Sequence, residues 1–216
     1  MAGMRVRGRL AALLPVLAAF LFGPLLAWRR LGPLDFWWGM SFSVAALVML
    51  SFLADRSHRT SLLEDLKEGL ARKIAWGVLS ALVLYGVFWV GNAASRAVLA
   101  SAGKEIGAVY GFKHDASVFR VGLLIIFIIG PGEELFWRGF LQRLWQKRLG
   151  LPAGWLLASG FYAVVHAGSG NLMLVLSALV CGLFWGALYS RFRSTVLVAI
   201  SHTIWDILIF ILFPLG

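Results

Sequence analysis

Residues 118–142 read VFRVGLLIIFIIGPGEELFWRGFLQ. The first part of this stretch is almost entirely apolar, and roughly 20 mostly apolar residues are enough for a helix to cross a membrane. The second part carries Glu133, Glu134 and Arg138, which are costly to place inside a bilayer. The stretch therefore predicts a membrane-spanning helix that carries charged side chains for a functional reason.

The rest of the chain has the composition of a membrane protein. Of its 216 residues, 60% are hydrophobic and 14% are charged, and the mean hydropathy is +0.84. A soluble chain has about 25% charged residues, so this chain has too little polar surface to face water. Seven apolar stretches are long enough or nearly long enough to be spans, at about 10–27, 36–54, 74–91, 118–142, 152–167, 172–190 and 195–213. We predict an all-α fold, a polytopic transmembrane helical bundle of about seven spans, with residues 1–216 as a single membrane domain.

The first apolar run needs separate treatment, because three arginines precede it as in a signal peptide. Pro15 and Pro24 interrupt the run, and no small-x-small cleavage site precedes Trp28. We therefore predict a first helix that is retained.

A short amphipathic helix is predicted between the second and third spans. In Thr60–Lys73, Ser61 and Glu64 have the spacing of a capping box, and three leucines fall on one helical face. Such a helix suits the membrane surface.

The charge pattern predicts the orientation. The net charge is +10, but no basic face is sustained along any element, so we predict no nucleic acid partner. With the N-terminus inside, the inner side would collect Arg5, Arg7, Arg9, Arg56, Arg59, Lys67, Arg72, Lys73, Arg143, Lys147, Arg148, Arg191 and Arg193. The outer side would keep Arg29, Arg30, Arg96, Lys104, Lys113 and Arg120. This excess favours the N-terminus inside.

Ionisable residues in the interiors of the spans are almost confined to three late stretches. Those stretches carry Glu133-Glu134-x-x-x-Arg138, Tyr162-x-x-x-His166 and His202-x-x-x-Asp206. At about 1.5 Å of helix per residue, these groups can meet at a similar depth, and we expect their site to open to the inner side.

Spacing within the motifs suggests different tasks for the two glutamates. Glu134 and Arg138 are four residues apart, which predicts a salt bridge within the helix. Glu133 points about 100° away from Glu134 and is left free. A carboxylate and two imidazoles around a wet cavity can hold and deprotonate a water molecule. His202 and Asp206 are also four residues apart and share one helical face.

The three motifs, in this order and on successive late spans, resemble those of the CAAX protease and bacteriocin-processing (CPBP/Abi) family of intramembrane proteases. Its best-known members are the type II CAAX prenyl endopeptidases. The resemblance covers about 118–213, which we interpret as the catalytic core.

The resemblance also implies roles. Glu133 resembles the general base that activates the attacking water, and His166 its partner in holding that water. His202 would stabilise the oxyanion of the tetrahedral intermediate, and Asp206 would assist or orient it. The supporting residues would be Glu134, Arg138 and Tyr162. The implied reaction is peptide-bond hydrolysis by a glutamate-activated water, without a covalent intermediate.

Two positions depart from the family pattern. Tyr162 stands where Phe is common, and Asp206 stands where the prenyl endopeptidases carry Asn. An ionised Asp cannot donate a hydrogen bond to an oxyanion, so Asp206 is protonated, orients His202 or contributes to a metal site. A zinc-dependent version of the enzyme would use Glu133, His166, His202 and Asp206 as ligands. We favour a mechanism with no metal and no other cofactor.

Other functions remain as alternatives. Intramembrane carboxylates and histidines also serve proton relays and transport, and some relatives are assigned as non-enzymatic immunity proteins. Ser169, close to His166, only approaches a rhomboid-type serine motif, and the single cysteine, Cys181, lies in an apolar run that favours packing.

The resemblance leaves the substrate open. The expected partners are the lipid bilayer and a membrane-anchored protein or peptide, either with a prenylated CAAX-like tail or with a C-terminal sorting tail. Cleavage of a sorting tail would make this chain similar to the myxosortases. The expected location is a prokaryotic plasma membrane.

Overall fold

The computed structural model describes residues 2–113 and 116–216, with side chains from residue 8 onward in these ranges. Almost all of this part is helical. The helices are α1 (Ala2–Trp28), α2 (Phe36–Ala54), α3 (Arg56–Lys67), α4 (Leu70–Val98), α5 (Ala102–Tyr110), α6 (Val118–Leu124), α7 (Gly130–Glu134), α8 (Arg143–Leu149), α9 (Leu151–His166), α10 (Leu172–Phe192) and α11 (Thr195–Ile207). The π-helical segments are η2 (Ile125–Ile129), η3 (Leu135–Gln142) and η5 (Leu208–Leu212), and the 3₁₀ segments are η1 (Gly111–Lys113) and η4 (Ala167–Ser169). The predicted all-α bundle is confirmed.

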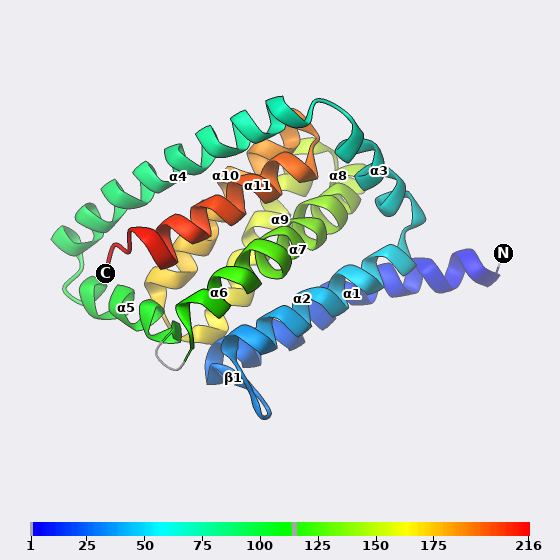
Figure 1. Ribbon diagram of the computed structural model, residues 1–216. Helices are drawn as coiled ribbons and strands as arrows, with labels where there is room; N and C mark the ends of the chain where they lie inside the picture. The colour runs from blue at the N-terminus through cyan, green and yellow to red at the C-terminus, as the bar shows by residue number, and fades with distance from the viewer. Residues whose placement is uncertain (1, 114–115) are drawn as a thin grey trace.

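The long helices run side by side between two ends of the molecule (Figure 1). The α3 end holds α3, α8 and the start of α4, together with the short connections α8–α9 and α10–α11. The α5 end holds α5, the C-terminus and a tight hairpin that the sequence did not predict. In this hairpin β1 (Arg30–Leu31) pairs antiparallel with β2 (Leu34–Asp35).

Fewer helices qualify as spans than predicted. Within the described residues, five are long and apolar enough, and a bent pair made of Ala102–Lys113 and Val118–Leu149 brings the number to six. The predicted fourth span, 118–142, belongs to this pair. The predicted fifth span is α9, whose 16 residues fall short of the roughly 20 that a straight span needs. The chain is an integral membrane protein of this helical type.

The predicted amphipathic helix is present with different bounds. It runs over Arg56–Lys67 and is capped by Asp55, whose carboxylate accepts a hydrogen bond from the backbone N–H of Ser57 at 2.9 Å. The predicted start at Thr60, with Ser61 as the cap, is therefore wrong. Partial burial disfavours the charged form of Asp55, but hydrogen bonds from Ser57 and the charge of Arg143 hold its pKa below the ordinary value.

A stripe of small residues at four-residue spacing on α10, made of Ala178, Gly182, Gly186 and Ser190, packs closely. A Cβ added at Gly182 would lie 3.1 Å from the backbone of Ser159, so α9 and α10 approach within the space that only glycine leaves. At the end of the stripe, the Ser190 hydroxyl accepts hydrogen bonds from Gln142 and Gln146. The stripe therefore fixes α10 against both α9 and the helix that carries the charged motif.

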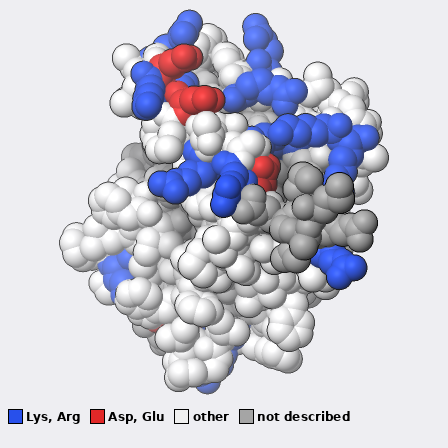
Figure 2. Space-filling view, turned by 90° about the vertical axis from the view of Figure 1, so that its right-hand side faces the viewer, with Lys and Arg blue, Asp and Glu red and all other residues white. Residues whose placement is uncertain are grey.

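Basic side chains gather near the α3 end. Figure 2 faces the side of the molecule where this end lies and shows Lys and Arg concentrated on its upper part, above a largely uncharged surface. The side chains of Arg5 and Arg7, which belong to the predicted inner-side group, lie outside the described residues.

Candidate active site

The two glutamates lie on α7, a five-residue segment with a π-helical stretch on each side, η2 and η3. π-Helical turns inside helices occur frequently at functional sites because they redirect side chains. A Cβ added at Gly132 would lie 2.2 Å from Cγ1 of Val44, so the missing side chain lets α2 pack directly against this segment. Glu133 and Glu134 are both buried as a result.

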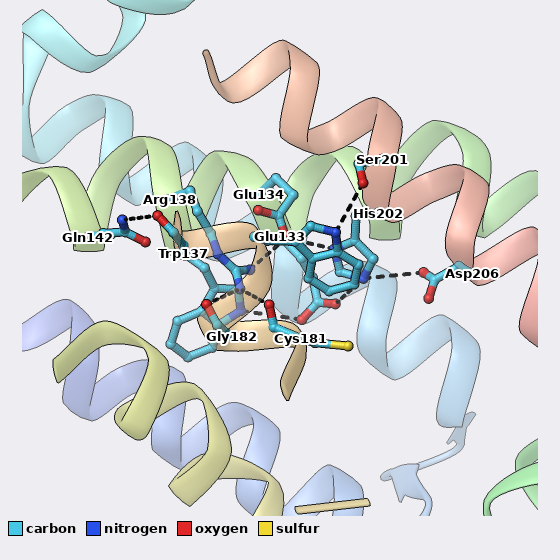
Figure 3. A network of polar contacts seen from close by, with 12 residues as sticks. Glu133, Glu134, Trp137, Arg138, Gln142, Cys181, Gly182, Ser201, His202 and Asp206 are labelled. Atoms are coloured by element: carbon cyan, nitrogen blue, oxygen red, sulfur yellow. Dashed lines mark hydrogen bonds and ion pairs between the residues drawn. The ribbon is translucent and has the colours of Figure 1, made fainter. Parts of the chain in front are cut away.

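Glu134 is held by two partners, as Figure 3 shows. Its Oε1 atom accepts a hydrogen bond from Nη1 of Arg138 at 2.6 Å and lies 2.7 Å from Nδ1 of His202. The predicted salt bridge within the helix is thus present. The contact with His202 was not predicted, and it makes Glu134 a fixed acceptor that orients the imidazole.

Arg138 is itself fixed by further contacts. It donates to the backbone oxygen of Cys181 at 3.3 Å, and its guanidinium stacks over Tyr162 and Trp185 at 5.1 and 5.4 Å. Its side chain is 3% exposed and that of Glu134 is fully buried. A charge pair this deep is retained only when its hydrogen bonds are nearly complete.

Glu133 is offset from Glu134 by about 100° around the helix, and the two carboxylates approach different nitrogens of His202. Its Oε1 accepts a hydrogen bond from the Trp137 indole at 3.3 Å, and its Oε2 lies 3.7 Å from Nε2 of His202. On the opposite side of that nitrogen, Oδ2 of Asp206 lies at 3.5 Å. Nε2 of His202 therefore faces two carboxylates at distances that a small shift would turn into hydrogen bonds.

The ring of His202 is clamped by an aromatic side chain from α10. Trp185 stacks on it with 3.8 Å between the ring centroids and 24° between the planes. The Trp185 indole donates to the hydroxyl of Ser201 at 3.3 Å, and Ser201 in turn bonds to Ser80 of α4 at 2.9 Å. These contacts fix the orientation of the His202 imidazole ring.

His166 is the last residue of α9 and lies at the α5 end. Its Nδ1 lies 2.8 Å from the backbone oxygen of Tyr162. A carbonyl only accepts, so Nδ1 carries a proton and Nε2 of the neutral ring keeps a free lone pair. Tyr162 thus orients His166 through its backbone oxygen, a contact that a Phe at this position could also make.

The four predicted catalytic residues, Glu133, His166, His202 and Asp206, line one cavity of about 110 Å³. Its other walls come from the first turns of α2, the C-terminal part of α1, α5 and the first half of α10. Such a space accommodates water beside the four polar groups. All of these walls lie toward the α5 end. The lining thus extends toward the α5 end, away from the basic cluster, whereas the sequence predicted a site that opens to the inner side. The side of the membrane on which the cavity opens stays a prediction.

The residues of two alternative nucleophiles have other partners. The hydroxyl of Ser169 donates to the backbone oxygen of His166 at 2.7 Å and accepts from the backbone N–H of Asn171, so it is engaged by a turn. Cys181 is buried in the cavity wall. A thiol this deeply buried is not expected to form a reactive thiolate.

A metal site needs several ligands gathered around one point. Among the side chains that the structure describes, no three His, Cys, Asp or Glu residues are arranged so that they could hold one metal ion. Nε2 of His202 lies 3.5 Å from Asp206 and 3.7 Å from Glu133, and these three groups are not arranged as ligands of one ion. The four candidate zinc ligands therefore do not form a ligand set in this structure.

These observations define a class: an integral membrane protein with a cavity inside its helical bundle, lined by two histidines and acidic side chains from three late helices. Residues 115–208 match the family model described as type II CAAX prenyl endopeptidase Rce1-like. This part of the chain, which contains all three motifs, is therefore Rce1-like, and the predicted resemblance is confirmed. Comparison with curated proteins and with solved structures gave no match.

Proposed function

We propose that this protein is an intramembrane endopeptidase that hydrolyses a peptide bond near the C-terminus of a membrane-anchored substrate. The observation that carries the proposal is the placement of Glu133, His166, His202 and Asp206 around one cavity inside the bundle. A protease needs a base, a held water and a donor for the oxyanion within one small space.

The proposed reaction begins with a water molecule between Glu133 and the free Nε2 of His166. Glu133 takes a proton from this water as the oxygen attacks the scissile carbonyl carbon. The negative charge that develops on the carbonyl oxygen is stabilised by the N–H of His202 at Nε2. Collapse of the tetrahedral intermediate breaks the C–N bond, and the proton held by Glu133 passes to the leaving amine.

Asp206 takes a supporting part in this proposal. Its carboxylate lies 3.5 Å from Nε2 of His202, on the opposite side from Glu133. There it keeps the imidazole protonated and aimed at the cavity, so the Asp in this position orients the donor instead of acting as one.

We propose a metal-independent reaction, and chelation tests it. Purified protein treated with a strong zinc chelator is expected to cleave a membrane-anchored substrate at the rate of untreated protein. The reason is that, among the described side chains, no three His, Cys, Asp or Glu residues are arranged to hold one metal ion. Loss of cleavage on chelation that added zinc restores, measured by product formation, would show instead that the residues rearrange around a metal.

A second cavity supports a substrate with a hydrophobic anchor. This apolar cavity of about 210 Å³ lies between α4, α5, α10 and α11, and it shares Trp205 and Phe210 with the catalytic cavity. Its rim carries exposed apolar residues such as Val87 and Leu176. An anchor can therefore pass from the lipid between α4 and α10 to the catalytic groups.

Filling this apolar cavity is expected to slow cleavage. Gly91 lines the cavity, and a Cβ added there meets nothing within 4 Å, so Gly91→Leu fits without disturbing the helix. We expect kcat/KM to fall at least about tenfold, chiefly through a higher KM, because the substitution weakens binding of the substrate's anchor.

Gly86→Leu provides the matched control. Gly86 lies on the same helix and is equally free of neighbours, but it does not line the cavity. Its cleavage kinetics are expected to equal those of the unmodified protein. Equal kinetics for both variants would contradict entry of the anchor along this path.

A further inference from the structure

The catalytic cavity extends from the middle of the bundle toward the α5 end. Its deepest wall is made by Glu133, Trp185 and His202, near the middle of their helices. From there the lining extends to residues at the α5 ends of their helices, among them Leu26, Phe36, Trp37, Phe112, His166, Leu174 and Phe210. His166 is about 22 Å along α9 from Leu151 at the α3 end.

The cavity also reaches the surface at this end. A third cavity of about 490 Å³ shares Phe36, Trp37 and Phe112 with the catalytic cavity, and it is bordered by the polar side chains of Arg29 and Asp35. Asp35 is partly exposed and pairs with Arg120 at 2.6 Å. This third cavity, called the mouth below, adjoins the catalytic cavity at the α5 end and is bordered by polar side chains.

Lys and Arg residues mark the opposite end as cytoplasmic. The described basic residues at the α3 end are Arg9, Arg56, Arg59, Lys67, Arg72, Lys73, Arg143, Lys147, Arg148, Arg191 and Arg193. Those at the α5 end are Arg29, Arg30, Arg96, Lys104, Lys113 and Arg120. Short connections with excess Lys and Arg stay in the cytoplasm, and the basic α3, lying across this end, suits the anionic inner leaflet.

We infer that the catalytic cavity opens to the non-cytoplasmic side of the membrane, and that the substrate is an exported protein held by a hydrophobic anchor. This inference rests on the proposed function. The bond that is cut lies in the outer half of the bilayer, where the apolar cavity between α4 and α10 receives the anchor and the mouth at Arg29 admits water and the polar chain. Cleavage then follows export and releases the exported part from its anchor.

Cysteine labelling in cells tests this orientation. Lys104 at the α5 end and Lys147 at the α3 end are both exposed lysines on helices, so Lys104→Cys and Lys147→Cys form a matched pair. The unmodified chain, whose Cys181 is buried, gives the background. We expect a membrane-impermeant maleimide to label Lys104→Cys in intact bacterial cells at least about tenfold more than Lys147→Cys, which becomes labelled after permeabilisation.

Labelling in the reverse order, or equal labelling of both variants in intact cells, would overturn the inference. Neither result would touch the proposed function, because cleavage by protein purified in detergent does not depend on orientation. Conversely, detergent-purified protein that cleaves equally well without the Glu133 carboxylate would overturn the proposed function while leaving the labelling result intact.

Discussion

Glu133→Gln is expected to lower kcat at least about a thousandfold while leaving KM nearly unchanged. General-base catalysis contributes roughly 10² to 10⁴ in rate, and an amide of the same shape cannot take a proton from water. The substitution keeps an oxygen that accepts the Trp137 hydrogen bond at 3.3 Å. It also removes one charge from a buried cluster in which Asp206 and Glu134 are both near His202. The fold should therefore persist.

The measurement is cleavage of a membrane-anchored substrate by purified protein, followed by the appearance of the shortened product. Glu64→Gln, the same chemical change on the surface helix α3, serves as the control and should cleave normally. The thermal midpoint of Glu133→Gln in detergent should stay within about 3 °C of the unmodified protein, equivalent to roughly 1 kcal/mol. If the Glu133→Gln variant retains a tenth of the activity, Glu133 is not the general base.

Features that depend on neighbouring residues in the sequence were predictable. The apolar runs indicate a helical membrane bundle because lipid offers no hydrogen-bond partners. The backbone groups must therefore bond to one another, as they do in a helix. The ion pair of Glu134 and Arg138 follows from their spacing of four, and the separation of Glu133 from Glu134 follows from the angle between successive residues of a helix. The match to an Rce1-like family model rests on the same local motifs.

Features that depend on contacts between distant helices were not predictable. Trp185 is 17 positions before His202 in an ordinary apolar run, and only the packing of α10 against α11 stacks the two rings. The contact between Glu134 and His202 likewise joins two spans. For α3, both Asp55 and Ser61 are suitable N-cap residues. The structure uses Asp55, which also forms an ion pair with the distant Arg143 at 2.7 Å.

The direction in which the cavity extends from Glu133 was not predictable from the depth of a single residue. Glu133 lies near the middle of its helix, so its distance from either end is similar and says nothing about the side. His166 carries the information, because its roughly 21 Å from Pro152 places it at the far end of a 16-residue helix. The position of His166 therefore depends on the length of α9, and the ends of a helix are difficult to locate from one sequence.

Arg138→Met is expected to lower both stability and activity. Removing one partner of a buried ion pair costs about 3–5 kcal/mol because it leaves an uncompensated charge, here the carboxylate of Glu134, whose Oε2 already has no partner. For a chain of this size that corresponds to a fall of roughly 10 °C in the thermal midpoint. Arg143→Met, which breaks the more exposed pair with Asp55 at the α3 end, should lower the midpoint less and leave cleavage unchanged.

The double variant Glu134→Gln with Arg138→Met separates packing from positioning. Replacing both charges by neutral groups of similar size is often nearly neutral for stability, so the thermal midpoint should return to within a few degrees of the unmodified value. Cleavage should stay at least about a hundredfold slower, because a neutral amide in place of the Glu134 carboxylate no longer balances the positive charge on His202 while that imidazole stabilises the oxyanion. The loss should appear in kcat with KM unchanged, as for an interaction made in the transition state. If the double variant recovers stability and cleavage together, the Glu134–Arg138 pair has only a structural role in the core. The orientation of His202 would then come from Trp185 and Asp206 alone.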